Sequence, residues 1–355
     1  MAYGAILNQK AEPGMSAEII LSLDSDNYTS FTATSPSGKQ YNGSIVNGQW
    51  MVTGLAEYGE YSVVAQGSTP YSNTVDITVC QQYVIGVNGV NSVLNSNPWE
   101  LISQISNEGT ASSYWAVGDA KQITINATIG TQSYSNYQPW VYILGFNHNA
   151  SHEGNNRIHF GCFQSAQTYS ASGGIALDDS NYNSQTSTTL AFHMNTTNTN
   201  SGGWQSSIMR QQVLDSDASS ATSGSSNSFL AALPSDLQAV LKQCTKYTNN
   251  AGQSSAQSAV TATQDWVFLL SEYEVQGSIT SANTYEQNYQ QQYQYYANGN
   301  SKVKYRQSAT GIAARWWNRS PRASDIFGFC IVGADGSAYI DGASGSFGLA
   351  PGFCV

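Results

Sequence analysis

Short alternating runs of apolar and polar residues, separated by turn-forming segments, fill the first eighty or so positions of the chain. Alternation with a period of two predicts half-buried strands, and segments such as SPSGK and VNG are typical of tight turns. The spacing favours an all-β, immunoglobulin-like sandwich over residues 1–82. The predicted strands are Ala17–Leu23, Thr29–Thr34, Tyr41–Val46, Gln49–Thr53, Gly59–Gln66 and Ser72–Val79.

The pattern changes after residues 83–96, a mixed Gly, Asn and Val segment that we interpret as a linker. Asn97 and Pro98 are suited to the start of a helix, and the next apolar residues recur at helical spacing up to Gly109. A second helix is predicted from Ser235 through Cys244, and a third, Gln-rich helix carries a tyrosine stripe. The apolar and tyrosine positions are Trp99, Leu101, Ile102, Ile105, Tyr285, Tyr289, Tyr293 and Tyr296.

The last forty residues, from Trp316 to Val355, alternate large or glycine residues with small polar ones. The apolar run Ile326–Val332 predicts a buried central strand, and the glycines that follow predict turns in which a positive φ costs little. We expect the larger residues to form a rigid frame. The frame residues are Trp316, Trp317, Arg319, Gly336, Gly348 and Phe353, with Arg319 paired to Glu272 or Glu274.

Composition narrows the possible partners. Only 10% of the 355 residues are charged and the net charge is −10, with 13 basic residues spread along the chain. Phosphate contacts need clustered Lys and Arg, so we expect neither a nucleic acid nor an anionic membrane as partner. No apolar run reaches the roughly twenty residues of a membrane span. The N-terminus lacks the features of a signal peptide, so we expect synthesis in a cytoplasm without secretion.

The cysteines form no CxxC pair, so a structural zinc site is not expected. Cys80, Cys162 and Cys244 lie among apolar residues and are predicted to be buried thiols. The positions of Cys330 and Cys354 leave a disulfide between them open.

No other motif indicates a metal, a cofactor or a nucleophilic serine, since G-x-S-x-G, HxH and HExxH are all missing from the sequence. We therefore interpret the histidines as structural, and the acidic loop as a weak calcium signal only. These residues are His148, His152, His159, His193, Asp178, Asp179, Asn181 and Asn183.

A set of motifs along residues 97–355 gives a resemblance. They include VGDAKQITI, GFNH, GGWQSSIMR, LPSDL, SEYEV, WWNRSP and GLAPGF, in that order. With these motifs the chain resembles a domain family of gut-type bacteria and their phages. That family is similar to C-type-lectin-like domains of the formylglycine-generating-enzyme kind, among them the variable proteins of diversity-generating retroelements and phage tropism determinants.

The resemblance implies an α+β, C-type-lectin-like domain over 97–355, with a ligand-binding, variable surface at 316–354. The EPN and WND triplets of calcium-dependent lectins do not occur in this sequence. By motif position the surface residues would be Asn318, Arg322, Ser324, Asp325, Phe327, Asp335, Ser337, Tyr339, Asp341, Ser344, Ser346 and Phe347.

The expected function is that of a non-enzymatic phage adhesin of the receptor-binding or tail-fibre type, located in the virion. Its partners would be a host cell-surface protein or glycan and, through the N-terminal domain, other virion proteins. A homotrimer is compatible with that role. One alternative is a head-fibre or virion decoration protein. Another is a cysteine-modifying oxidoreductase that uses Cys330 and Cys354.

Overall fold

The computed structural model describes residues 5–10, 17–22, 27–55, 57, 59–67, 70–77, 90–168 and 174–355. The chain is mostly β-sheet with short helices, and it divides into two compact units, Met1–Asn91 and Ser92–Val355. The boundary lies inside the segment 83–96 that was predicted to be a linker. Cys80 lies outside the described residues, so its predicted burial is not addressed.

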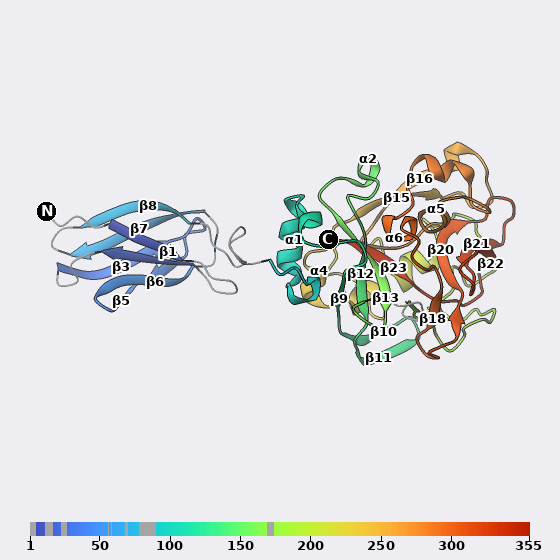
Figure 1. Cartoon of the computed structure of the whole chain (residues 1–355), viewed down its shortest axis with the longest axis horizontal. Helices are drawn as coiled ribbons and strands as arrows, with labels where there is room; N and C mark the ends of the chain where they lie inside the picture. Colours follow the sequence, from blue (N-terminus) through green and yellow to red (C-terminus); the bar gives the residue numbers. More distant parts are fainter. Residues whose placement is uncertain are drawn as a thin grey trace. The chain divides into compact units, whose positions relative to one another are not determined.

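Two four-stranded antiparallel sheets build the first unit (Figure 1), in the orders β1-β2-β6-β5 and β4-β3-β7-β8. Side chains from both sheets form one core, in which Phe31 and Trp50 meet edge to face at 6.5 Å between ring centroids. The strands are β1 (Ala5–Lys10), β2 (Ala17–Ser22), β3 (Tyr28–Thr34), β4 (Gln40–Asn42), β5 (Ser44–Val46), β6 (Gln49–Leu55), β7 (Gly59–Gly67) and β8 (Tyr71–Ile77).

The run predicted as one strand, Tyr41–Val46, is two strands in different sheets. The chain passes from β4 to β5 at Gly43, whose N–H donates to the Phe31 carbonyl at 2.6 Å. A Cβ at Gly43 would lie 2.6 Å from the Phe31 ring. The switch between sheets therefore depends on a residue without a side chain.

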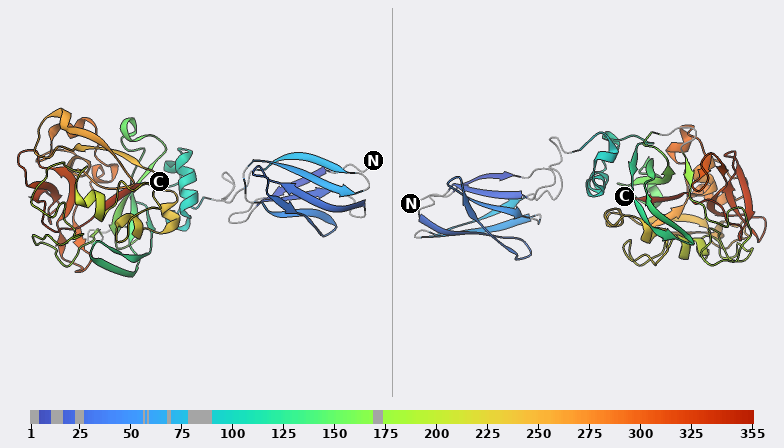
Figure 2. Two further views of the ribbon diagram at one scale, coloured as in Figure 1. Left: turned by 180° about the vertical axis from the view of Figure 1, so that it is seen from behind. Right: turned by 90° about the horizontal axis from the view of Figure 1, so that it is seen from below.

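A five-stranded sheet in the order β17-β23-β13-β12-β9 runs through the second unit, and a three-stranded sheet β20-β21-β22 lies at its periphery (Figures 1 and 2). Small sheets β14-β18-β19, β10-β11 and β15-β16 complete it. The strands are β9 (Ala120–Gln122), β10 (Ile125–Ile129), β11 (Gln132–Tyr137), β12 (Trp140–Phe146), β13 (Ile158–Gln164), β14 (Ile175–Ala176), β15 (Cys244–Asn249), β16 (Val260–Asp265), β17 (Val267–Leu269), β18 (Lys304–Arg306), β19 (Ala313–Ala314), β20 (Trp316–Pro321), β21 (Gly328–Val332), β22 (Ala338–Gly342) and β23 (Pro351–Cys354).

The helices of this unit are short. They are α1 (Trp99–Asn107), α2 (Ala150–Glu153), α3 (Phe229–Ala232), α4 (Ser235–Gln238), α5 (Glu272–Gln276) and α6 (Gln294–Ala297), with single turns η2 (Leu94–Ser96), η3 (Ala111–Ser113), η4 (Met209–Val213), η5 (Gln257–Ala259) and η6 (Thr284–Asn288). The four apolar positions predicted for α1 are buried. Among the described residues, none of the helices has the length and apolar character needed to cross a membrane.

Two predicted helices are much shorter than expected. The helix predicted from Ser235 ends at Gln238, and Cys244 begins β15 instead. The Gln-rich segment splits into η6 and α6, with Tyr289 between them stacked on Tyr247 at 4.7 Å. Tertiary packing of the tyrosines therefore overrides the local helical periodicity.

Gly348 is needed for close packing beside β20, although its φ is not positive. A Cβ there would lie 2.7 Å from the Ala176 Cβ and 2.9 Å from the Arg315 carbonyl oxygen. Of the glycines predicted to need a positive φ in this region, only Gly336 has one, at +86°. At Gly342 and Gly345, as at Gly348, a side chain is excluded because neighbouring atoms lie too close.

We expect Gly348→Ala to destabilise the chain by about 1–3 kcal/mol, because the new methyl group overpacks a region where backbone atoms cannot yield. Gly145→Ala is the control, since its Cβ would meet neighbours at ordinary contact distances near 3.9 Å. Urea unfolding of both variants measures the difference. Equal unfolding free energies for the two would contradict the packing argument.

Candidate binding surface

The β21–β22 hairpin and the loop before β21 carry most of the predicted binding residues at the edge of the second unit (Figure 1). Tyr339 is 55% exposed and Phe327 is 50% exposed, which is unusual for large aromatic side chains. Eight of the predicted residues are exposed or partly exposed, and we call them the display surface. They are Arg322, Ser324, Asp325, Phe327, Asp335, Ser337, Tyr339 and Asp341.

Four residues predicted for this surface are buried instead. They are Asn318, Ser344, Ser346 and Phe347. The Ser346 hydroxyl donates to Asp179 at 2.8 Å, and the Phe347 ring packs edge to face on Trp317 at 5.2 Å. Asn318 lies inside β20, and Ser344 donates to Gln185. The cause is the path of the chain, since residues 343–355 are all buried as the chain returns to β23 in the five-stranded sheet.

An open pocket of about 400 Å³ lies on the display surface, lined by Arg315, Gly333, Ala334, Asp335, Ser337 and Tyr339. The Arg315 guanidinium lies 5.8 Å from the centre of the Tyr339 ring and 3.4 Å from the Asp341 carboxylate. The Arg315 side chain remains 42% exposed. The pocket can therefore offer an aromatic face, an arginine fork and carboxylate oxygens to one ligand.

Arg315 was not predicted from the sequence. It directly precedes Trp316, the first residue of the frame. Side chains of consecutive residues in a strand point to opposite faces, so a buried Trp316 predicts an outward-facing Arg315. Its place next to Trp316 was the signal in the sequence that could have identified Arg315 as a surface residue.

Two contacts fix the turn between β21 and β22. The Asp335 carboxylate accepts hydrogen bonds from the Ser337 hydroxyl and backbone N–H, at 2.7 and 3.0 Å, and these bonds lower the pKa of Asp335. On the other side, the Gln276 amide of α5 donates to the Gly336 carbonyl at 3.2 Å. A turn fixed in this way presents its side chains with little ordering cost on binding.

The aromatic residues predicted to form the frame are buried. Trp316 and Trp317 have no exposed surface, and their indole N–H groups donate to the carbonyls of Lys302 and Phe192. Phe353 stacks on Phe160 at 5.3 Å in the five-stranded sheet, so it anchors β23 rather than the hairpin.

Arg319 is buried in β20 and pairs with Glu274 of α5, one of the two partners expected. Its guanidinium donates to both Glu274 oxygens, at 2.5 and 3.0 Å, and also to the Thr248 hydroxyl and the Leu269 carbonyl. Glu272, the other candidate, accepts backbone N–H groups of residues 280–282 instead. The pairing ties β20 to α5 and to β15.

A second buried cation completes this network. The Lys246 ammonium lies 3.2 Å from Glu274 and 2.7 Å from Glu153, so two cations face two carboxylates. Burial opposes ionisation of Glu274, but the charges of Arg319 and Lys246 outweigh it and lower its pKa. Glu274 also closes a capping box with Ser271 at the start of α5. We call these four charged residues, Glu153, Lys246, Glu274 and Arg319, the buried network.

The cysteines are arranged differently from the expectation. Cys354 forms a disulfide with Cys244, so Cys244 is not a free thiol and the Cys330–Cys354 bond left open by the sequence does not occur. Cys162 and Cys330 are buried free thiols, and Cys330 lies 3.6 Å from Glu272. The two cysteines required by the oxidoreductase alternative are thus not paired with each other.

The predicted acidic loop uses its oxygens within the protein. Asp178 accepts from Arg306 and Ser308, and Asp179 accepts from backbone N–H groups and Ser346. Among the described residues, two buried groups have metal-ligating atoms close together: His148, Glu153 and Glu274, and His159, Cys244 and Cys354. The first group has Lys246 bound between its carboxylates.

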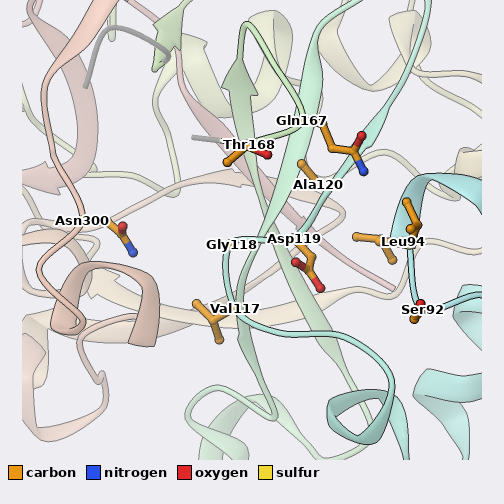
Figure 3. Close-up of a pocket in the computed structure, with 10 residues that line it drawn as sticks. Ser92, Leu94, Val117, Gly118, Asp119, Ala120, Gln167, Thr168 and Asn300 are labelled. Atoms are coloured by element: carbon orange, nitrogen blue, oxygen red, sulfur yellow. The ribbon is translucent and has the colours of Figure 1, made fainter. Parts of the chain in front are cut away.

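A second pocket, also of about 400 Å³, lies near the start of the second unit (Figure 3). Its lining is mostly small and polar, and Asp119 is its only ionisable side chain. The Asp119 carboxylate already accepts the Ala116 N–H at 2.8 Å. The lining residues are Ser92, Val93, Leu94, Val117, Gly118, Asp119, Ala120, Gln167, Thr168 and Asn300.

Comparison with known proteins gives one match. Residues 185–355 match the family model described as "Domain of unknown function (DUF6273)". No curated protein and no solved structure matched the chain. The matched region contains the display surface, Lys246, Glu274 and Arg319, but not Glu153.

Replacing Arg319 by Met should destabilise the chain by about 3–5 kcal/mol, because Glu274 would lose one of its two cations in a buried site. Arg322→Met is the matched control. The Arg322–Asp325 pair is partly exposed, so its loss should cost under about 1 kcal/mol. Thermal or urea unfolding distinguishes the two. A cost for Arg319→Met as small as that of the control would show that the network does not stabilise the frame.

Glu286 should make stability depend on pH. Burial raises its pKa to about 7, against hydrogen bonds from Ser320 and the Asn249 N–H. Between pH 4.5 and 7 the folded chain therefore retains a proton that the unfolded chain has released, and stability falls as pH rises. The free energy of unfolding of Glu286→Gln should therefore fall less between these pH values, by up to about 3 kcal/mol, than that of the unaltered chain.

Urea unfolding at pH 4.5 and 7.5 measures the slope for Glu286→Gln. Glu100→Gln, at an exposed helix position, is the control and should follow the unaltered chain. If Glu286→Gln shows the same change in stability over this range as the unaltered chain, Glu286 does not titrate as proposed.

Proposed function

We propose that this protein is a non-enzymatic adhesin of a phage particle that binds a bacterial surface ligand through the display surface. The observation that carries the proposal is the contrast between exposed and buried positions around the hairpin. Tyr339, Phe327 and small polar residues face outward, while the adjoining strands are fully buried.

The residue types of the display surface suit recognition of another molecule. Tyrosine supplies a large contact area with only two side-chain torsions to fix, and Ser and Asp supply adaptable hydrogen bonds. The pocket beside Tyr339 adds Arg315, a residue that is enriched among binding hot spots. Adhesion needs no more than this surface and a stiff support.

We further propose that the second unit has a C-type-lectin-like arrangement, and that the first is an immunoglobulin-like module that attaches the protein to the virion. Two antiparallel sheets around one core support the proposal for the first unit. For the second, the support is its mixture of short helices with a central sheet and a peripheral hairpin, together with the motif resemblance.

Particles carrying Arg315→Ala and Tyr339→Ala together should adsorb to their host at least about tenfold more slowly, because both sides of the pocket are removed. Tyr114→Ala is the control. Tyr114 is 37% exposed and follows η3 next to α1, which lies on the opposite side of the second unit from β21 and β22 (Figures 1 and 2).

Adsorption is measured as loss of free particles, with mass spectrometry of purified virions to show that the chain is present. Absence of the chain from virions would contradict the assignment to a particle. Normal adsorption by virions that carry the double variant would contradict binding through this surface.

A further inference from the structure

Three buried side chains with metal-ligating atoms meet where three strands approach one another. His159 of β13 is opposite Cys354 of β23 in the sheet register, and Cys354 is bonded to Cys244 of β15. The ligating atoms of the three residues lie within 4.8 Å of one another. None of the three residues has any exposed surface. The His159 Nδ1 atom also lies 3.2 Å from the Tyr293 hydroxyl, a contact that metal binding at this nitrogen would replace.

One of the distances between these atoms is close to the edge of a tetrahedral zinc site. With Zn–S bonds of about 2.3 Å and Zn–N bonds of about 2.0 Å, tetrahedral geometry separates S from N by about 3.5 Å. In the structure, Cys354 Sγ lies 3.3 Å from His159 Nδ1. The two sulfur atoms would have to separate to about 3.8 Å once their bond is reduced.

We propose that Cys244, Cys354 and His159 form a thiolate–imidazole site for a divalent metal such as Zn²⁺ when the disulfide is reduced. A dithiol or phosphine reductant supplies two electrons, and two protons are taken up as the S–S bond breaks to give two thiols. Binding of the metal then displaces these two protons and forms two metal–sulfur bonds. The oxidised and metal-bound forms exclude each other, because both use the same sulfur atoms.

The surroundings hold one carboxylate near the three ligands and balance the charge. The Glu153 carboxylate lies 3.8 Å from His159 Nδ1, on the side of the buried network. A tetrahedral site needs four ligands, and a water molecule or a Glu153 oxygen released from Lys246 would complete the set. Two thiolates neutralise a divalent ion, so the metal adds no net charge beside Lys246, which Glu153 already pairs. Metal binding is therefore compatible with the buried network.

The site is independent of the proposed adhesive function. The display surface lies on the loop before β21, the turn between β21 and β22, and β22, whereas these ligands come from β13, β15 and β23. A metal here would brace the C-terminal strand against β15 in reducing surroundings, where the disulfide is lost. Failure of either proposal leaves the other standing.

The test uses the full chain and Co²⁺, a spectroscopic probe for zinc sites with thiolate ligands. The chain is reduced with a phosphine, freed of excess reductant without air, and titrated with Co²⁺. We expect a sulfur-to-cobalt charge-transfer band that saturates at about one equivalent and is abolished by one equivalent of Zn²⁺. The unreduced chain should show no band.

A triple variant, Cys80→Ser, Cys162→Ser and Cys330→Ser, is the matched control and should keep the band. Cys244→Ser and Cys354→Ser should each lose it, and His159→Gln should weaken it. Because these variants can also lose stability, the thermal midpoint of the reduced, unaltered chain is measured with and without Zn²⁺, and it should rise.

The proposal is overturned if the reduced chain gives no band and no rise in midpoint. It is equally overturned if the band survives in Cys244→Ser or Cys354→Ser, or disappears in the triple variant, because other thiols would then hold the metal.

Discussion

A buried carboxylate, Glu274, is the constraint on which the second unit depends. It closes the cap of α5 and holds both Arg319 and Lys246, so one side chain fixes a helix and two strands from separate sheets. Two cations opposite two carboxylates in a site without solvent are costly to desolvate, and removal of any one leaves a charge uncompensated. The arrangement is therefore specific, because few other packings of these elements could satisfy four buried charges.

This constraint explains how an exposed hairpin is supported from beneath by buried strands. Arg319 holds β20, β21 is hydrogen-bonded along β20, and β22 is the outer strand. The display surface uses other side chains, of which Asp335 and Ser337 fix the turn between β21 and β22 but do not contact the buried network. The buried strands β20 and β21 and the exposed residues proposed to bind a ligand are thus separate parts of this sheet, which is the condition for varying one without losing the other.

The sequence predicted the elements whose signals are local. Alternation located β2, β3, β6 and β7 within a residue or two, and the burial of Trp316, Trp317 and Arg319 followed from their size and pattern. It could not predict contacts set by distant segments. The inward return after Gly342 depends on pairing between β23 and β13, and the Cys244–Cys354 bond joins residues 110 positions apart. The surface was therefore extended too far, to Ser344, Ser346 and Phe347, and Arg315 was missed.

The central claim is that the buried residues of this C-terminal region, and not the display surface, specify the fold. Two libraries of the chain test it most directly, one randomised at the eight display-surface residues and one at Asn318, Ser344, Ser346 and Phe347. Both are displayed on yeast and sorted for resistance to protease. We predict that most members of the first library remain folded and that most of the second unfold. Equal loss of folding in the two libraries would contradict the account.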